Sequence, residues 1–291
     1  MSSPLLQRRL IFITGKGGVG KSTVARALAG VAARRGMRTI VADINGAGDQ
    51  HEHQLAPNLS SLSIDPQSAM EEYLSLKVGG TAGQILGQSR MFSAFAMATP
   101  GMRELLSLGK IWELAQPQRR APDAEPYDLT VVDAPASGHG AALLRTPRTF
   151  AQITKVGPVA SQANAIAQTL ADREFTAIVA VAVPEDLAVT ETVELDEALQ
   201  RERLNLDLVV LNKRHPDRFD EREREQLRGW DPIRAPAARL ALAADLRARS
   251  EAEQAARLEE RFGERLRSLP FLFEPLIGAA GLQRLGEVLA L

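Results

Sequence analysis

The stretch ITGKGGVGKST, residues 13 to 23, decides the fold of this chain. It fits the pattern G-x-x-x-x-G-K-[ST], and it lies between a short apolar run and a helix-like segment, the context that a phosphate-binding loop requires. Glycines let backbone N–H groups curl around phosphate oxygens, and the helix that starts at the loop adds partial positive charge. The sequence therefore predicts a nucleotide-binding loop made by Gly15, Lys16, Gly17, Gly18, Val19, Gly20, Lys21, Ser22 and Thr23.

The rest of the chain alternates between strand-like and helix-like segments. The strand-like runs are rich in β-branched residues and apolar on both faces, as parallel strands covered by helices are. Helix-like stretches between them include residues 21–36 and residues 100–116. We therefore predict an α/β fold, a P-loop NTPase with a doubly wound, mostly parallel sheet flanked by helices. The predicted strands span residues 10–14, 39–44, 129–134, 176–183 and 206–212.

Composition sets further bounds on the protein. With 291 residues, 45% of them hydrophobic, the chain can bury a full core, and we expect a single P-loop domain over residues 1–291. Residues 213–266 are rich in arginine and glutamate at helical spacing, which predicts solvated surface helices; a partner-docking face is the alternative. A net charge of -1 provides no basic field, so no nucleic-acid partner is expected. No apolar run is long enough for an integral membrane segment, and we expect a cytoplasmic protein.

A phosphate loop of this type works with a divalent cation. Lys21 is placed to reach the β and γ phosphate oxygens, and Ser22 to bind Mg²⁺. A magnesium–triphosphate site also needs a carboxylate at a strand end, and Asp43 and Asp133 each close an apolar run. Both of their strands are expected to lie beside the first strand. We assign Mg²⁺ to Ser22 and Asp133, and the orientation or deprotonation of the attacking water to Asp43.

The residues that follow Asp133 read APASGHG. Pro135 and Gly138 suit a loop that rearranges when the γ-phosphate leaves, which predicts a conformational switch there. A strand-end aspartate can also act only as a turn or helix cap, and that alternative stands for both Asp43 and Asp133.

The base must be recognised by another segment. LVVLNKRH, residues 208–215, is similar to the guanine-reading Asn-Lys-x-Asp element of GTPases, but His215 stands where the aspartate that accepts guanine N–H groups would be. This favours adenine, with Asn212 as its hydrogen-bonding partner. His51 and His53, in a chain without cysteine, make a poor zinc site, and residues 51–53 are interpreted as a polar loop.

The loop contains a second lysine, Lys16. Because Lys21 and the loop amides already face the phosphates, a cation at this outer position is expected to project away from them. We interpret Lys16 as aimed at a phosphate of another molecule.

The loop resembles the KGGVGK signature of the deviant Walker-A ATPases, a group that includes the ParA and MinD positioning ATPases and the nitrogenase iron protein. Within this group the chain is most similar to the ArsA-like family of arsenite-pump and tail-anchored protein targeting ATPases, and in particular to its compact bacterial branch. The similarity rests on DAPASGHGAALLRTP (133–147), PEDLAVTETVEL (184–195) and LPFLFEPLIGAAGL (269–282), among other segments.

This resemblance implies ATP and Mg²⁺ as cofactors, and a dimer in which Lys16 reaches the ATP of the partner. It also implies that Asp43 is the catalytic residue of switch I and that Asn212 contacts the base. The remaining residues that it implies are Asp133, Pro135, Gly138 and His139 for switch II, and Pro270 with Phe271 for the loop that lines the adenine.

The chain departs from the family pattern at several points. The switch I sequence Asp-Pro-Ala-His reads Asp43-Ile44-Asn45-Gly46 here, so its proline and histidine are missing. Without cysteine and with one phosphate loop, arsenite transport of the pump type is not expected. The zinc clamp of the targeting factors is absent, and their long helical insert after switch II is absent or very short.

These features together predict an ATP-hydrolysing dimeric switch that couples its nucleotide state to binding of a protein or membrane partner. The dimer would form with a second copy or with a paralogous ArsA-like subunit, and the client would be a protein. A ParA- or MinD-like positioning ATPase is one alternative. A nucleotide-dependent small-molecule kinase is another, and a kinase of that kind needs no lysine at position 16.

Overall fold

The computed structural model describes residues 4–44, 51–78, 98–120, 124–154, 156–231 and 233–290. An eight-stranded sheet has the order β3-β4-β2-β5-β1-β6-β7-β8, and its neighbours are parallel except for the edge pair β3 and β4. The predicted α/β class is confirmed, and each predicted strand is present. The strands are β1 (Leu10–Gly15), β2 (Thr39–Asp43), β3 (His53–Ala56), β4 (Leu59–Ser63), β5 (Leu129–Ala136), β6 (Thr176–Ala182), β7 (Leu208–Arg214) and β8 (Leu266–Pro270).

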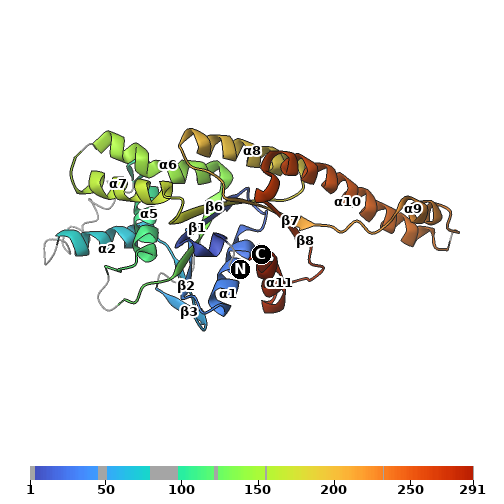
Figure 1. Cartoon of the computed structure of the whole chain (residues 1–291), viewed down its shortest axis with the longest axis horizontal. Coiled ribbons are helices and arrows are strands. Elements are labelled where there is room, and N and C mark those ends of the chain that lie inside the picture. The colour runs from blue at the N-terminus through green and yellow to red at the C-terminus, as the bar shows by residue number, and fades with distance from the viewer. Residues whose placement is uncertain are drawn as a thin grey trace.

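The two faces of the sheet enter different hydrophobic cores. On β1, Leu10 and Phe12 pack on one side, whereas Ile11 and Ile13 pack on the other. All four are buried, which explains why the run is apolar at every position. Figure 1 shows α6, α7 and α8 over one face and α1 and α11 over the other. The helices are α1 (Lys21–Arg34), α2 (Pro66–Val78), α5 (Met102–Ala115), α6 (Ser137–Thr154), α7 (Pro158–Ala171), α8 (Asp186–Arg201), α9 (Glu221–Arg228), α10 (Ala235–Phe262) and α11 (Ala279–Leu289), with short 3-10 turns at Pro4–Gln7 and Gly263–Arg265.

The strand order differs from the prediction in one respect. Asp133 lies on β5, which is the direct neighbour of β1, as predicted. Asp43 lies on β2, and β5 separates β2 from β1. The buried strands share one apolar pattern, so their sequences do not determine their order in the sheet. The crossover connections between the strands determine it. The two carboxylates still meet, because Asp43 and Asp133 are paired positions on adjacent parallel strands.

The prediction of a polar loop at residues 51–53 is wrong for His53, which begins β3. This strand pairs with β4 in an antiparallel hairpin that turns at Asn58, whose φ of 59° is left-handed. All of β3 is exposed, so it lacks the alternation of apolar and polar residues by which a half-buried strand is recognised.

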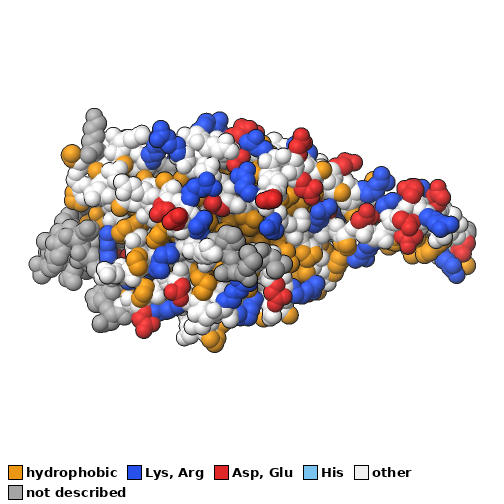
Figure 2. Space-filling model, in the orientation of Figure 1, with side chains coloured by type: hydrophobic (Ala, Val, Ile, Leu, Met, Phe, Trp, Pro, Cys, Tyr) orange, Lys and Arg blue, Asp and Glu red, His pale blue; other side chains and the backbone are white. Residues whose placement is uncertain are grey.

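Residues 213–266 are mostly helical, as predicted, but they form more than a surface layer. Figure 1 shows α10 extending beyond the edge of the sheet, with α9 at its outer end. The inner end of α10 contributes Leu258 and Phe262 to the core, and at the outer end Arg224 donates to Asp245 at 2.8 Å in a buried pair. Figure 2 shows acidic and basic side chains intermingled along this arm. In the described part of the chain, no helix has both the length and the apolar character needed to cross a membrane.

Candidate functional site

The phosphate loop connects β1 to α1, and two of its glycines are required by their surroundings. Gly15 has a φ of 140°, and a Cβ there would stand 2.1 Å from the carbonyl oxygen of Val181 on β6. Gly20 has a φ of 100°, and a Cβ there would stand 2.4 Å from the amide nitrogen of Asn212. A larger residue at either position would push the loop away from the strands that hold it. The helix predicted to begin at Lys21 does begin there.

Two consecutive residues of β7 hold this loop from the side. The Nδ2 atom of Asn212 donates to the Val19 carbonyl oxygen at 2.8 Å, and the Nζ atom of Lys213 donates to the Gly18 carbonyl oxygen at 3.0 Å. Asn212 is only 4% exposed, and Lys213 adopts a left-handed φ of 60°. The sequence predicts a base contact for Asn212, and the structure gives its amide nitrogen to the loop. An adenine contact would therefore use its Oδ1 atom.

Ser22, Lys21 and the two strand-end aspartates meet beside the loop. The Ser22 hydroxyl hydrogen-bonds to the Asp133 carboxylate, which also feels the charges of Asp43 and Lys21. Burial raises the pKa of Asp133, and the negative charge of Asp43 adds to this rise. Burial also lowers the pKa of Lys21, whose ammonium donates to the Lys16 carbonyl oxygen at 3.0 Å. Burial thus disfavours the ionised forms of Asp133 and Lys21, and a bound cation would offset that cost at Asp133.

The donor atoms at this point suit a magnesium ion. Ser22 offers a hydroxyl and Asp133 a carboxylate, and hard cations prefer oxygen ligands of this kind. Asp43 is only half-buried, so its carboxylate is more accessible than that of Asp133, as an acid–base group needs to be. Asn45 and Gly46, which follow it in the switch I segment, lie outside the described residues.

Lys16 lies on the outer side of the loop. Its Nζ atom is 3.1 Å from an Oε1 atom of Glu191 on α8, and these two side chains are 34% and 30% exposed. Such an exposed pair is worth less than about 1 kcal/mol, because water and salt screen it. Lys16 also lines a cavity of about 310 Å³ together with Phe271 and with Arg247 and Glu251 of α10. The ammonium is therefore held in place by a contact that costs little to break.

Phe271 brings the segment predicted to line the adenine to the same cavity. It follows Pro270, the last residue of β8, and its N–H donates to the Arg214 carbonyl oxygen at 2.8 Å. Its ring stacks on His215, with 4.4 Å between the centroids. Glu251 of α10 accepts from the backbone N–H of His215 and lies 2.8 Å from its Nδ1 atom. This contact fixes the ring against which Phe271 packs.

A family model described as an anion-transporting ATPase, the ArsA ATPase, matches residues 8–157 and 151–235. The chain belongs to this family. ATPase BagA of Mycobacterium tuberculosis is 32% identical over 237 residues, which cover 74% of this chain and 68% of BagA. ATPase ASNA1 homolog 1 of Paramecium tetraurelia is 24% identical over 256 residues (70% of this chain and 74% of that protein). ATPase GET3 of Podospora anserina is 23% identical over 263 residues (73% and 76%).

This ArsA-family protein binds nucleotide and is an ATPase, which hydrolyses ATP to ADP and phosphate. The phosphate loop and both strand-end aspartates lie within the matched residues. The match therefore covers the segment in which Ser22 and Asp133 meet.

In this ATPase the residues after Asp133 do not form the predicted loop. β5 continues through Pro135 to Ala136, and α6 begins at Ser137, so Gly138 and His139 lie in the first turn of α6. Gly140 packs so closely on β1 that a Cβ there would stand 2.3 Å from the Oγ1 atom of Thr14. This close packing attaches the start of α6 to the sheet. The proline and glycines in this segment suggest a loop, and the sequence alone does not reveal the tertiary contact. A displacement of Asp133 would therefore pass directly to α6.

Sequence reasoning does not identify three residues in or beside the cavity that Lys16 lines, namely His215, Arg247 and Glu251. It considers His215 only as the residue that removes a guanine contact, and the stacking on Phe271 is not foreseen. Glu251 and Arg247 reach the cavity from α10, whose charge pattern predicts solvated surface helices, with a partner-docking face as the alternative. No spacing in the sequence connects these residues to the phosphate loop.

Proposed function

We propose that this ATPase is a dimeric switch in which Lys16 of one subunit binds the phosphates of the ATP held by the other subunit. The observation that carries the proposal is the different placement of the two lysines. Lys21 lies inside the loop beside Asp133, whereas the Lys16 ammonium stands outside it on Glu191. The second subunit is another copy of this chain or a paralogous subunit of the family. Opening of the dimer after hydrolysis changes the affinity for a protein partner.

The residues of one subunit supply the remaining chemistry. Ser22 and Asp133 would hold Mg²⁺, which would neutralise charge on the phosphates. Lys21 binds the β and γ oxygens, and Asp43 orients a water whose oxygen attacks the γ-phosphorus. The bond from that phosphorus to the β–γ bridging oxygen breaks, and ADP leaves with the electron pair. The proton of the attacking water passes to Asp43 or to the phosphate.

Lys16 can leave Glu191 for a phosphate of the partner at a small cost in free energy. Release from Glu191 costs less than about 1 kcal/mol, since both side chains are about one-third exposed. A lysine that meets a triphosphate gains charge-assisted hydrogen bonds, which are roughly twice as strong as neutral ones. Dimer formation is therefore coupled to bound ATP.

Binding of the adenine base in the same cavity completes the proposed site. The Phe271 ring lies in the cavity that Lys16 also lines, beside Pro270 and supported by His215. The half-buried ring offers a flat apolar surface for a base, and the Asn212 amide oxygen offers an acceptor for the adenine amino group.

Light scattering of the Asp43→Asn protein tests the proposal, because slow hydrolysis preserves the ATP-bound state. We expect the mass to double when Mg-ATP is added and to stay monomeric when Lys16→Ala is combined with Asp43→Asn. Glu191→Gln is the matched control, since it removes the partner of Lys16 but keeps the lysine, and it should retain the dimer. A dimer that survives Lys16→Ala would contradict the cross-subunit role. Full ATP turnover by the Lys16→Ala protein would contradict it as well.

A further inference from the structure

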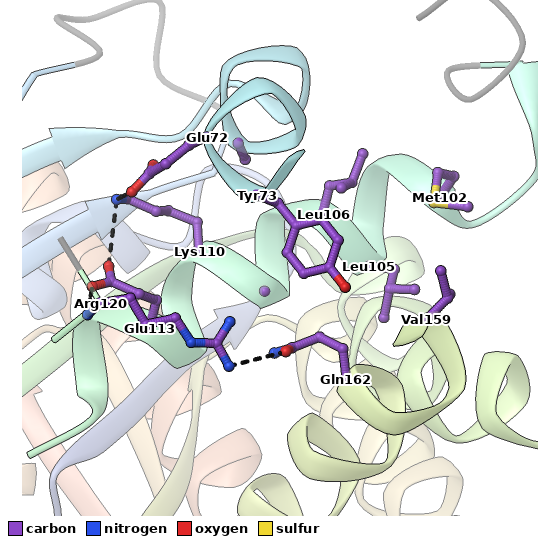
Figure 3. Close-up of a pocket in the computed structure, with 12 residues that line it drawn as sticks. Glu72, Tyr73, Met102, Leu105, Leu106, Lys110, Glu113, Arg120, Val159 and Gln162 are labelled. Atoms are coloured by element: carbon purple, nitrogen blue, oxygen red, sulfur yellow. Dashed lines mark hydrogen bonds and ion pairs between the residues drawn. The ribbon is translucent and has the colours of Figure 1, made fainter. Parts of the chain in front are cut away.

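A second cavity lies away from the phosphate loop, between α2, α5 and α7. Its volume is about 70 Å³, roughly half that of a cavity that encloses benzene, so it would enclose only part of a small molecule and is far too small for a polypeptide helix. Figure 3 shows that Leu105, Leu106 and Met102 line it from α5, with Val159 opposite them on α7. Its walls are mainly apolar, and polar side chains gather at one end.

Gly109 keeps part of this cavity open. It lies within α5, where glycine costs about 0.5–1 kcal/mol relative to alanine. It is not among the glycines with positive φ, and a Cβ added to it would meet no described atom within 4 Å. Neither backbone conformation nor crowding by the described residues therefore requires glycine here. Gly109 therefore lowers the stability of α5 slightly, and its missing side chain leaves space in the wall of the pocket.

Two side chains in the lining of the cavity, Tyr73 and Arg120, carry hydrogen-bond donors. The Tyr73 hydroxyl is buried and has no hydrogen-bond partner among the described residues. Arg120 donates to the Oε1 atom of Gln162 at 3.2 Å and lies over the Trp112 ring at 4.7 Å. Within the described residues, no carboxylate pairs with its guanidinium. Figure 3 shows Arg120 and Gln162 reaching toward each other, and the Tyr73 hydroxyl directed into the space between the helices.

The Tyr73 hydroxyl and the Arg120 charge are close enough to influence each other. Burial raises the pKa of Tyr73, and the positive charge of Arg120 opposes this rise. A buried hydroxyl without a partner costs on the order of 1–3 kcal/mol, a cost that a ligand acceptor atom would remove.

The carboxylates of the pocket are already engaged by other cations. Glu72 accepts from Lys110 at 2.7 Å, and Glu113 accepts from Lys110 at 3.4 Å and from Arg119 at 3.2 Å. Burial acts to raise the pKa of Glu113, but Arg119 and Lys110 together bring it below its usual range. The open hydrogen-bonding capacity is therefore on the donor side, at Arg120 and Tyr73.

We propose that this pocket binds a small apolar molecule that carries a single carboxylate, such as a short-chain acid. The carboxylate accepts from the Arg120 guanidinium, the Tyr73 hydroxyl and the Gln162 amide, and the apolar part lies along α5 over Gly109. A ligand cation would instead be repelled by the positive charge of Arg120. The site uses none of the nucleotide-binding residues, so it does not depend on the proposed dimeric switch.

Hexanoate is a suitable probe, with hexan-1-ol as its uncharged counterpart and hexylamine as its cationic one. Trp112 lies against Arg120 and reports binding by its fluorescence, provided that Trp230→Phe removes the signal of the exposed tryptophan on the arm. We expect saturable binding of hexanoate, at least about tenfold weaker binding of hexan-1-ol, and none of hexylamine.

Three substitutions in this Trp230→Phe background locate the probe. Arg120→Gln should weaken hexanoate at least about tenfold, and Gly109→Leu should abolish binding by filling the cavity. Arg145→Gln, at an exposed arginine on α6, is the matched control and should bind as the parent does. Circular dichroism checks that each variant is folded, and the three probes on the parent protein decide the ligand class even if a variant is not.

Several outcomes would overturn the proposal. The parent protein could fail to bind hexanoate up to about 10 mM, a concentration at which even weak pocket ligands are detected. Equal binding of hexan-1-ol would show that the carboxylate is not recognised. Undiminished binding to Gly109→Leu would show that the probe sits elsewhere.

Discussion

The molecule has two candidate binding regions that are built in different ways. One is the nucleotide edge of the sheet, by which we mean the phosphate loop with Asp43 and Asp133, and the other is the pocket between α2, α5 and α7. At the nucleotide edge, one short loop and the ends of neighbouring strands supply the groups, and backbone geometry places them. The pocket collects side chains as distant in sequence as Tyr73 and Gln162, and only helix packing brings them together. The first site is specified locally and the second by the whole fold. Substitutions in the two regions should therefore have separable effects.

The largest difference in ATP turnover is expected between substitutions of Lys21 in the phosphate loop and Lys110 in the pocket. Lys21→Ala should lower ATP turnover by about 10²–10³-fold, because the transferred phosphoryl group loses a preorganised cation. It should not lower stability without ligand, since burial disfavours the Lys21 charge. Lys110→Ala should keep turnover but lose roughly 1–3 kcal/mol of unfolding free energy, because Glu113 loses a buried partner. Equal loss of turnover in both variants would mean that the regions are not separable.

A smaller effect is expected where β7 supports the loop. Asn212→Ala leaves the buried Val19 carbonyl without its donor, and we expect a loss of about 1–3 kcal/mol in stability and weaker ATP binding. Lys213→Ala removes an exposed hydrogen bond to the adjacent carbonyl of Gly18 and is the matched control. Isothermal titration with ATP and urea unfolding check both variants. A larger effect for Lys213→Ala would contradict the supporting role of Asn212.

The pH dependence of stability tests the cost of burying the Asp133 carboxylate. The pKa of Asp133 is raised in the folded state, mainly by burial, so between the unfolded and folded pKa values the folded protein binds this proton more than the unfolded chain does. Stability from this group is present below the unfolded pKa, about 4, and is lost as the pH rises through the folded pKa. Without Mg²⁺ or nucleotide, Asp133→Asn should remove this loss and unfold at higher urea than wild type at pH 7. A variant less stable than wild type at pH 7 would contradict the burial cost.

The smallest expected effect compares two helical glycines. Gly109→Ala should stabilise the protein by about 0.5–1 kcal/mol, because the helix gains propensity and the new methyl group enters open space. Gly286→Ala on α11 should destabilise it, since a Cβ there would stand 2.5 Å from the Ala27 carbonyl oxygen. Thermal unfolding of the two variants measures the difference. Destabilisation by Gly109→Ala would show that the position is not open.

The same contrast explains how much the sequence could reveal. The phosphate loop, the start of α1 and the strand ends at Asp43 and Asp133 follow from short motifs with fixed spacing, because local backbone geometry produces them. The position of β5 between β1 and β2 does not follow, since several buried strands share one pattern. The strand β3 is exposed along its whole length, and its sequence has no alternation that would predict a strand. Gly140 packs closely on Thr14, and a helix begins where the sequence suggests a loop.

Sequence reasoning fails most clearly where distant side chains cooperate. His215 and Glu251 are held together by the path of α10, and Tyr73 and Arg120 by the packing of α2 on α5. Each of these residues is ordinary within its own segment. Their partners, and therefore their chemistry, are defined only by tertiary structure.

A mixing experiment tests the cross-subunit role of Lys16 most directly. Lys16→Ala and Asp43→Asn proteins, each inactive alone, are combined in equal amounts and ATP turnover is measured. A mixed dimer contains one complete site, in which the Asp43→Asn subunit lends its Lys16 to the partner's ATP, so activity should return to about a quarter of wild type when half of the dimers are mixed. No activity beyond the sum of the two variants would contradict the account, because Lys16 and Asp43 would then have to act within one chain.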